Sequence, residues 1–155
     1  SYVSIPYGAV SLAEKFNAHD KISAQDLFKF YRFVLYKFRQ LPWLLQGTKL
    51  PLVLLGGANR TVARKELMRL GRKDLENIHG VSMSAYSFIE TYTEWLGMDC
   101  KERADILGPE AERADIIIAG LSPIMFLIEY LQTPEIIFSE SGVREGVLYS
   151  MLKRK

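Results

Sequence analysis

A short glycine-containing segment is the part of the sequence best suited to bind a ligand. Residues 52–63 read LVLLGGANRTVA, an apolar run followed by Gly56, Gly57, Ala58 and Asn59. The apolar run predicts a strand and the residues after the glycines predict a helix, so the glycines fall at a strand-to-helix turn. Bare backbone can approach a ligand closely there, and the free amides of a first helical turn attract anions. The pattern therefore indicates a phosphate-binding loop.

The same pattern also has a purely structural interpretation. It is not a P-loop, because no Gly-Lys-Ser/Thr follows, and it is not a GxGxxG fingerprint. Small residues at such a turn can serve packing alone, so the local pattern leaves both interpretations open. Arg60, Arg64 and Lys65 on the predicted helix add positive potential, but only cations in the first turn can reach an anion in the loop.

Arg113, within ERADIIIAG at residues 112–120, is the second candidate. A guanidinium can bind two phosphate oxygens in parallel, which the ammonium group of lysine cannot do. The alternative is a surface ion pair with Glu110 or Glu112. Arg144 and Glu145 either line a ligand-binding cleft together with Arg113, or hold the last predicted helix in place.

The other reactive residue types form no recognisable catalytic or metal-binding set. His79 has no cysteine, aspartate or second histidine at metal spacing, which favours a structural role. Cys100 is the single cysteine, so no internal disulfide can form, and a reducing compartment is expected. We therefore expect a cytoplasmic protein and assign no catalytic residue or metal ligand within this sequence.

These candidates are positioned by alternating strands and helices, the pattern of a layered α/β domain with parallel pairing. The predicted strands are 2–10, 51–55 and 135–139. The predicted helices are a short turn at 12–16 capped by Ser11, 23–45 with its regular part ending at Pro42, 59–72, one from Ser82 or Ser84 to 96, 109–131 kinked at Pro123, and 143–155. Residues 98–106 are expected to form a short helix or a turn. Three strands make a thin sheet for so many helices, so we expect residues 1–155 to be a single but incomplete domain.

The hydrophobic pattern adds three expectations about burial. Strand 51–55 reads as buried on both faces, and Leu70 is expected in the core with Val62 and Leu67. Helix 23–45 is apolar nearly all round, so we expect it to be covered on more than one side. Its aromatic residues between 28 and 38 favour core packing over base stacking, and no nucleic-acid partner is expected.

Composition limits the class of protein. The chain has 155 residues, of which 48% are hydrophobic and 25% charged, with a net charge of +2. These values fit one globular domain and exclude disordered, collagen-like and disulfide-built chains. Apolar runs such as 116–121 are far shorter than the ~20 residues that cross a bilayer, and the N-terminus lacks a signal-peptide pattern. No membrane association is expected.

The near-neutral total conceals two segments of opposite charge. Residues 23–74 contain 11 lysines and arginines against 3 acids, whereas residues 76–140 contain 3 against 12. The basic segment either borders an anion such as a phosphate chain, or the two segments neutralise each other as opposite helix faces.

Five segments carry a resemblance to a known family. They read SIPYGAVSLAEKF (4–16), LVLLGGANRTVAR (52–64), IHG (78–80), ERADIIIAGLSPI (112–124) and EIIFSESGVREGVLY (135–149). Their order and spacing resemble the exopolyphosphatase and guanosine pentaphosphate phosphohydrolase family, Ppx/GppA. The chain is similar to the second of that family's two actin-like, ribonuclease-H-like domains, an α/β fold with a mixed sheet flanked by helices.

The resemblance implies a function. It implies a cleft between two domains in which the terminal phosphate of polyphosphate, or the 5′ phosphate of guanosine pentaphosphate, is hydrolysed with a magnesium ion. Gly56, Gly57, Ala58 and Asn59 would supply backbone donors to the phosphate and Arg113 positive charge. The family's DxGGGS loop would precede this sequence, and its catalytic glutamate would lie in the first domain, so the isolated chain is expected to be inactive.

The sequence departs from the family pattern at one position of the loop. Ala58 stands where many members have threonine, so a hydroxyl that could contact phosphate is replaced, and Asn59 is the residue expected to substitute for it. Three hypotheses stay open: an exopolyphosphatase-type hydrolase, a non-hydrolytic nucleotide or polyphosphate-binding module, and a structural domain that self-associates, for example as a homodimer. The choice between polyphosphate and guanosine pentaphosphate is also open.

Overall fold

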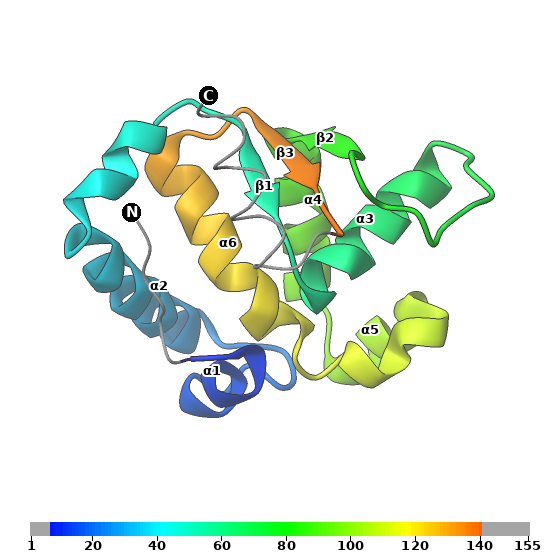
Figure 1. Cartoon of the computed structure of the whole chain (residues 1–155). Helices are drawn as coiled ribbons and strands as arrows, with labels where there is room; N and C mark the ends of the chain where they lie inside the picture. The colour runs from blue at the N-terminus through cyan, green and yellow to red at the C-terminus, as the bar shows by residue number, and fades with distance from the viewer. Residues whose placement is uncertain (1–6, 141–155) are drawn as a thin grey trace, which may run out of the picture.

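The structure, a computed structural model, describes residues 7–140 (Figure 1). The predicted helix 143–155, most of the predicted strand 2–10, and Arg144 and Glu145 lie outside these residues. The elements in chain order are α1 (Ala9–Lys15), α2 (Ala24–Arg39), the 3-10 helix η1 (Pro42–Gly47), β1 (Leu52–Leu54), α3 (Gly57–Arg69), β2 (Ser82–Ser84), α4 (Ala85–Leu96), α5 (Cys100–Leu107), the 3-10 helix η2 (Gly108–Arg113), α6 (Ile117–Leu131) and β3 (Glu135–Phe138).

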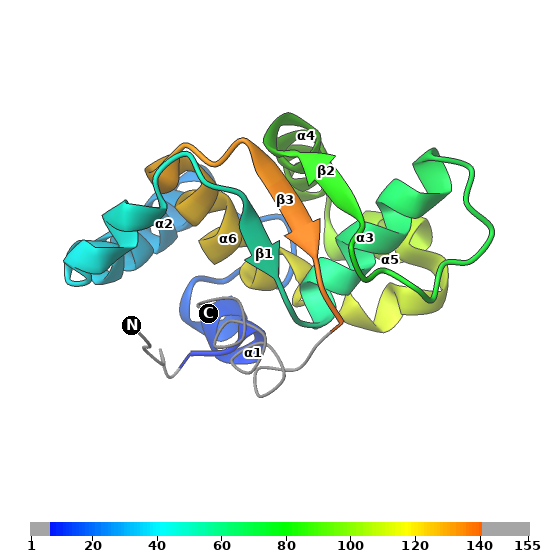
Figure 2. The ribbon, with the colours of Figure 1, turned by 45° about the horizontal axis from the view of Figure 1, so that its top comes forward.

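The three strands form one mixed sheet in the order β1-β3-β2 (Figure 2). β1 pairs with β3 in parallel, with Leu52 opposite Ile136, and β2 pairs with β3 antiparallel. The expected parallel pairing is therefore confirmed for β1 and β3. The sequence did not predict β2, because SMS is too short and polar to show a strand pattern.

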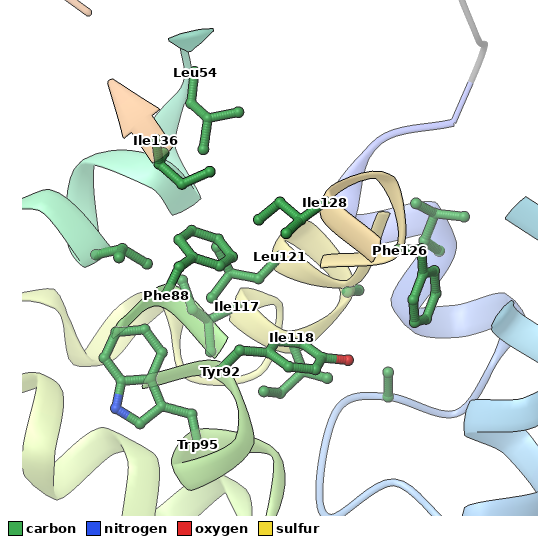
Figure 3. Packing of buried hydrophobic residues seen from close by; sticks show 14 of the residues in the cluster. Leu54, Phe88, Tyr92, Trp95, Ile117, Ile118, Leu121, Phe126, Ile128 and Ile136 are labelled. Atoms are coloured by element: carbon green, nitrogen blue, oxygen red, sulfur yellow. The ribbon is translucent and has the colours of Figure 1, made fainter. Parts of the chain in front are cut away.

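One face of the sheet packs against the main helices. Leu54 and Ile136 point toward α4 and α6, where they lie near Phe88 and Leu121 (Figure 3). Val53, on the opposite face of β1, is 58% exposed. The expectation that this strand is buried on both faces is therefore wrong, because among residues 7–140 helices cover only one face.

Helix α6 is the centre of the core. It packs against α1, α2, α3 and α4, and most of its side chains are buried, including Ile117, Ile118 and Leu121. Ser122, also on α6, shares a 2.7 Å hydrogen bond with the hydroxyl of Tyr92 from α4 and donates to the Ile118 carbonyl. No single helix in the described part of the chain is long and apolar enough to cross a membrane, and the only helix pair that passes this test together, 100–113 with 117–131, is bent by 94°.

That bend corrects the prediction of one helix over 109–131. The chain turns between η2 and α6, and Pro123 lies inside a continuous α6. The Ala114 carbonyl, at the bend, accepts a hydrogen bond from Arg103 Nε at 2.9 Å. In a continuous helix the Ala114 carbonyl would accept a hydrogen bond from a backbone amide of the next turn. Here the buried Arg103 side chain binds it, a contact that sequence periodicity cannot reveal.

Helix α2 is amphipathic and not covered all round. Phe30, Val34 and Phe38 are buried, whereas Phe28 and Tyr36 are each 62% exposed. The predicted helix also ends earlier, at Arg39, because Pro42 begins η1.

Smaller differences concern the helix ends. Ala9 and Val10 are helical, since Gly8 is the N-cap of α1 and the Ser11 hydroxyl accepts from the Gly8 amide at 3.1 Å. Leu70, predicted in the core, is 49% exposed because α3 ends at Arg69. Ser84 is the N-cap of α4, one of the two predicted caps.

Candidate anion-binding site

The turn from β1 into α3 leaves backbone donors free. Gly56 is exposed and adopts a φ of 111°, a conformation that favours glycine, and it is the N-cap of α3. The Arg60 amide donates to the Gly56 carbonyl at 3.1 Å, which starts the helical hydrogen bonds. Within residues 7–140 the amides of Gly57, Ala58 and Asn59 meet no hydrogen-bond acceptor. The expected donors therefore stand at the positive end of α3.

Arg113, the last residue of η2, lies directly against this turn. A Cβ placed on Gly57 would lie 2.8 Å from both Cζ and Nη2 of Arg113, with Nη1 closer still. Arg113 is partly buried, and within residues 7–140 its guanidinium forms no ion pair or hydrogen bond. The structure thus brings the two predicted site components together, and the alternative of an Arg113 ion pair with Glu110 or Glu112 is not observed.

This arrangement places two positive elements side by side. A helix N-terminus carries about half a positive charge and disfavours a neighbouring cation. Arg113 adds a full charge there, and its fork of N–H groups needs an acceptor. An anion at the turn would satisfy the three amides and the guanidinium together, and a phosphate group has enough oxygens to do so.

The carboxylate three residues before Arg113 is held by another helix. Glu110, on η2, accepts from Arg64 Nη1 at 2.8 Å and forms a short hydrogen bond with the Thr61 hydroxyl, both on α3. Arg64 also pairs with Glu76 at 3.0 Å. The hydrogen bond to Glu110 is the main reason that the pKa of Arg64 is raised above its usual value.

The side chains of Ala58 and Asn59 are both engaged by the fold around the loop. A Cβ on Gly120 of α6 would lie only 2.9 Å from the Ala58 Cβ, so Ala58 packs closely on that helix. Asn59 is buried, and its Nδ2 donates to the Leu55 carbonyl at 2.6 Å. The Asn59 side chain therefore braces the turn and does not replace a loop hydroxyl, so only its backbone amide is a candidate donor.

The other cations of α3 are paired with acids. Arg60 pairs with Glu140 at 3.1 Å, and Lys65 pairs with Glu94 at 3.0 Å while lying over the Trp95 ring. Together with the two pairs of Arg64, these contacts join the basic segment 23–74 to the acidic segment 76–140. On α3, the two oppositely charged segments therefore neutralise each other.

Arg103 is an important residue that sequence reasoning missed. It is 1% exposed, and its guanidinium donates to the carbonyls of His19, Asp20, Trp95, Met98 and Ala114 at 2.7–3.4 Å. Burial lowers its pKa from the usual value. By binding the carbonyl next to Arg113 it fixes the bend between η2 and α6. A lone arginine in a charged helix carries no sequence signal of such a role.

His79 and Cys100 take no part in the turn. His79 Nδ1 lies 3.4 Å from both the Ser139 hydroxyl and the Glu140 amide, at the end of β3. The Cys100 amide donates to Asp20, and its thiol is free.

Magnesium, which the resemblance implies, finds no ligand set in this part of the chain. Residues 7–140 contain no group of three or more histidine, cysteine, aspartate or glutamate side chains that could hold a metal ion. Glu110 and Glu140, two of the carboxylates paired with cations of α3, are already engaged by Arg64 and Arg60. The chemistry that these residues offer is therefore that of amide and guanidinium donors.

A mixed sheet packed on helices, with a strand-to-helix turn whose first amides are free within residues 7–140, makes this an α/β protein, and the matched structures place it in the actin-like ATPase fold. The chain belongs to the Ppx/GppA phosphatase family, whose model matches residues 1–155. The expected family and fold are thereby confirmed.

Solved structures give the same result. A Ppx/GppA family member from Aquifex aeolicus superposes with a TM-score of 0.75 at 26% identity, covering 98% of this chain and 48% of that one. An exopolyphosphatase from Cytophaga hutchinsonii, at 23% identity, shares the fold with a TM-score of 0.77, covering 97% and 49%. The chain therefore spans about half the length of these structures. A comparison with curated proteins finds no match.

Proposed function

We propose that this chain forms one wall of the phosphate-binding cleft of an exopolyphosphatase-type phosphoric anhydride hydrolase. The whole protein would remove the terminal phosphate of polyphosphate or the 5′ phosphate of guanosine pentaphosphate. One observation supports this most directly: the Arg113 guanidinium, which has no partner among residues 7–140, lies against Gly57 at the positive end of α3. Family membership supports the class of reaction.

In this proposal the chain binds and orients the phosphate chain. The amides of Gly57, Ala58 and Asn59 donate to oxygens of one phosphate, and Arg113 donates to the same or the next phosphate. Fixed donors hold the reacting phosphate in place and offset its charge, which are the main protein contributions to phosphoryl transfer. The catalytic glutamate would come from the other domain, so the isolated chain would bind phosphate without hydrolysing it.

A second candidate is a non-hydrolytic module that binds polyphosphate or a nucleotide. Ala58 favours it, because alanine offers no side-chain hydroxyl at the loop. Such a protein would retain the amides and Arg113, and so bind phosphate chains, but would lack one contact to the reacting group.

The two candidates are distinguished with the complete protein. We expect tripolyphosphate, polyphosphate or guanosine pentaphosphate to raise its Tm in both cases, because binding to the native state alone stabilises it. Release of free phosphate, followed with and without magnesium, is expected only for the hydrolase. If none of these anions shifts the Tm at low salt, both candidates are wrong and a structural role is supported.

A further inference from the structure

Glu110 and Arg113 are placed to pair with each other, yet they do not. They are three residues apart on η2, and side chains at this spacing line up on a 3-10 helix. The backbone of Glu110 departs from the helical region, with φ −104° and ψ 20°. Its carboxylate is directed instead to α3.

Both oxygens of that carboxylate are occupied by α3. Oε1 accepts from Arg64 Nη1 and Oε2 from the Thr61 hydroxyl, and the Glu110 side chain is only 15% exposed. The Thr61 hydroxyl also lies 3.3 Å from the Gly57 carbonyl oxygen, so its one proton is directed mainly to Glu110. One helix therefore provides the loop amides at its first turn and holds Glu110 at its second.

We propose that Arg64 and Thr61 sequester the Glu110 carboxylate and so keep Arg113 available for the phosphate chain. This rests on the proposed function, and it makes Arg64 and Thr61 positioning residues, since they act on the anion through Glu110 and Arg113. A carboxylate released by α3 would find Arg113 on its own turn. The resulting ion pair would compete with phosphate, because it offers the guanidinium the same kind of acceptor.

The test is a double-mutant cycle on tripolyphosphate affinity, measured calorimetrically in the complete protein. Arg64→Met frees Glu110, and we expect affinity to fall about tenfold, the scale of one charge-assisted contact. Glu110→Gln alone is expected to preserve or raise affinity. The double variant Arg64→Met/Glu110→Gln is expected to return to within about twofold of wild type, because a neutral amide no longer competes with the anion for Arg113.

Lys65→Met is the matched control. It removes one positive charge from the next position of the same helix and leaves Glu110 held, so its affinity is expected to stay close to wild type. If it falls as far as Arg64→Met, the effect is a general loss of positive potential and the proposal is overturned.

The remaining outcomes are also decisive. A double variant as weak as Arg64→Met means that Arg64 contacts the anion or supports the fold directly, which overturns the proposal. Should Arg64→Met fail to fold, the same cycle with Thr61→Val and Glu110→Gln replaces it. Failure of the proposed function has a different signature, because wild-type protein then shows no tripolyphosphate binding at all.

Discussion

The guanidinium of Arg113 rests against the Cα of Gly57, in the space that a side chain at position 57 would occupy. The contact joins two different elements, since Gly57 begins α3 and Arg113 ends η2. Gly57 is needed because any side chain there would overlap the Arg113 guanidinium. Its φ, unlike that of Gly56, does not lie in the left-handed region, so backbone conformation is not the reason for glycine. Substitutions on either side of this contact give the most direct tests of the site.

Gly57→Ala is expected to displace Arg113 while α3 still forms. The new Cβ would lie 2.8 Å or less from guanidinium atoms, so the side chain must move off the turn. Alanine otherwise favours a helix, so the free energy of unfolding should change by no more than about 1 kcal/mol. Tripolyphosphate affinity should fall about tenfold or more, as expected when a charged hydrogen bond is lost. Isothermal titration calorimetry and urea unfolding measure the two effects.

Gly97→Ala is the control for that substitution. A Cβ there would meet only backbone oxygens at an ordinary 3.7 Å and no atom of Arg113, so affinity should not change. Unchanged affinity in Gly57→Ala would show that phosphate does not use this turn.

Arg113→Lys is expected to weaken phosphate-chain binding more than it alters stability. Lysine keeps the charge but cannot bind two oxygens in a parallel fork. Because Arg113 forms no ion pair within residues 7–140, little native-state bonding is lost. We expect an affinity loss of about tenfold and a change in unfolding free energy below about 1 kcal/mol. A large loss of stability with normal affinity would assign Arg113 to the fold instead.

Gly120→Ala is expected to destabilise the contact of α6 with the first turn of α3. Its Cβ would lie 2.9 Å from the Ala58 Cβ, and two backbone-anchored groups cannot move apart without shifting a helix. Overpacking of this kind costs about 1–3 kcal/mol. Chemical denaturation measures the cost, and the double variant Gly120→Ala/Ala58→Gly should recover most of it. If the single variant is as stable as wild type, the two helices are not in close contact here.

Tyr92 predicts a pH dependence of stability. Burial raises the pKa of Tyr92 to about 12, although its hydrogen bond with Ser122 acts in the opposite direction. The unfolded side chain ionises near pH ~10, so the unfolded state loses a proton first as pH rises. The contribution to stability is therefore complete below pH ~10 and lost as pH rises toward 12, by about 2–3 kcal/mol in total.

The comparison with Tyr92→Phe isolates this contribution from other titrating groups. The variant loses the hydrogen bond to Ser122 and should be about 1 kcal/mol less stable at pH 7. The difference in unfolding free energy between wild type and variant should shrink above pH ~10 and change sign toward pH ~12, because the expected loss of about 2–3 kcal/mol exceeds the initial advantage of about 1 kcal/mol. A constant difference up to pH ~12 would contradict the pKa shift.

The strands β1 and β3 could be predicted because their sequence signals are local. The apolar runs at 52–54 and 135–138 are strands, and the glycine pair ends the first of them. The sequence failed where a contact distant in sequence overrides a local pattern. Arg103 donates to the Ala114 carbonyl, and the predicted helix bends there and not at Pro123. The exposure of Phe28 and Val53 likewise depends on which faces other elements cover.

By itself, the sequence determined the family. It also determined the strand-to-helix turn and the types of donor at it, because the glycines and the start of the helix follow one another directly in the chain. Only the tertiary structure decided which cation reaches that turn. Arg60, in the first turn of α3, and Arg113 were the cations that could reach it. Arg60 is paired with Glu140, whereas Arg113 lies against Gly57 and forms no ion pair within residues 7–140. The physical reason is competition: each carboxylate that folding brings to α3 neutralises a cation, and pairing between distant segments is set by packing and not by sequence order.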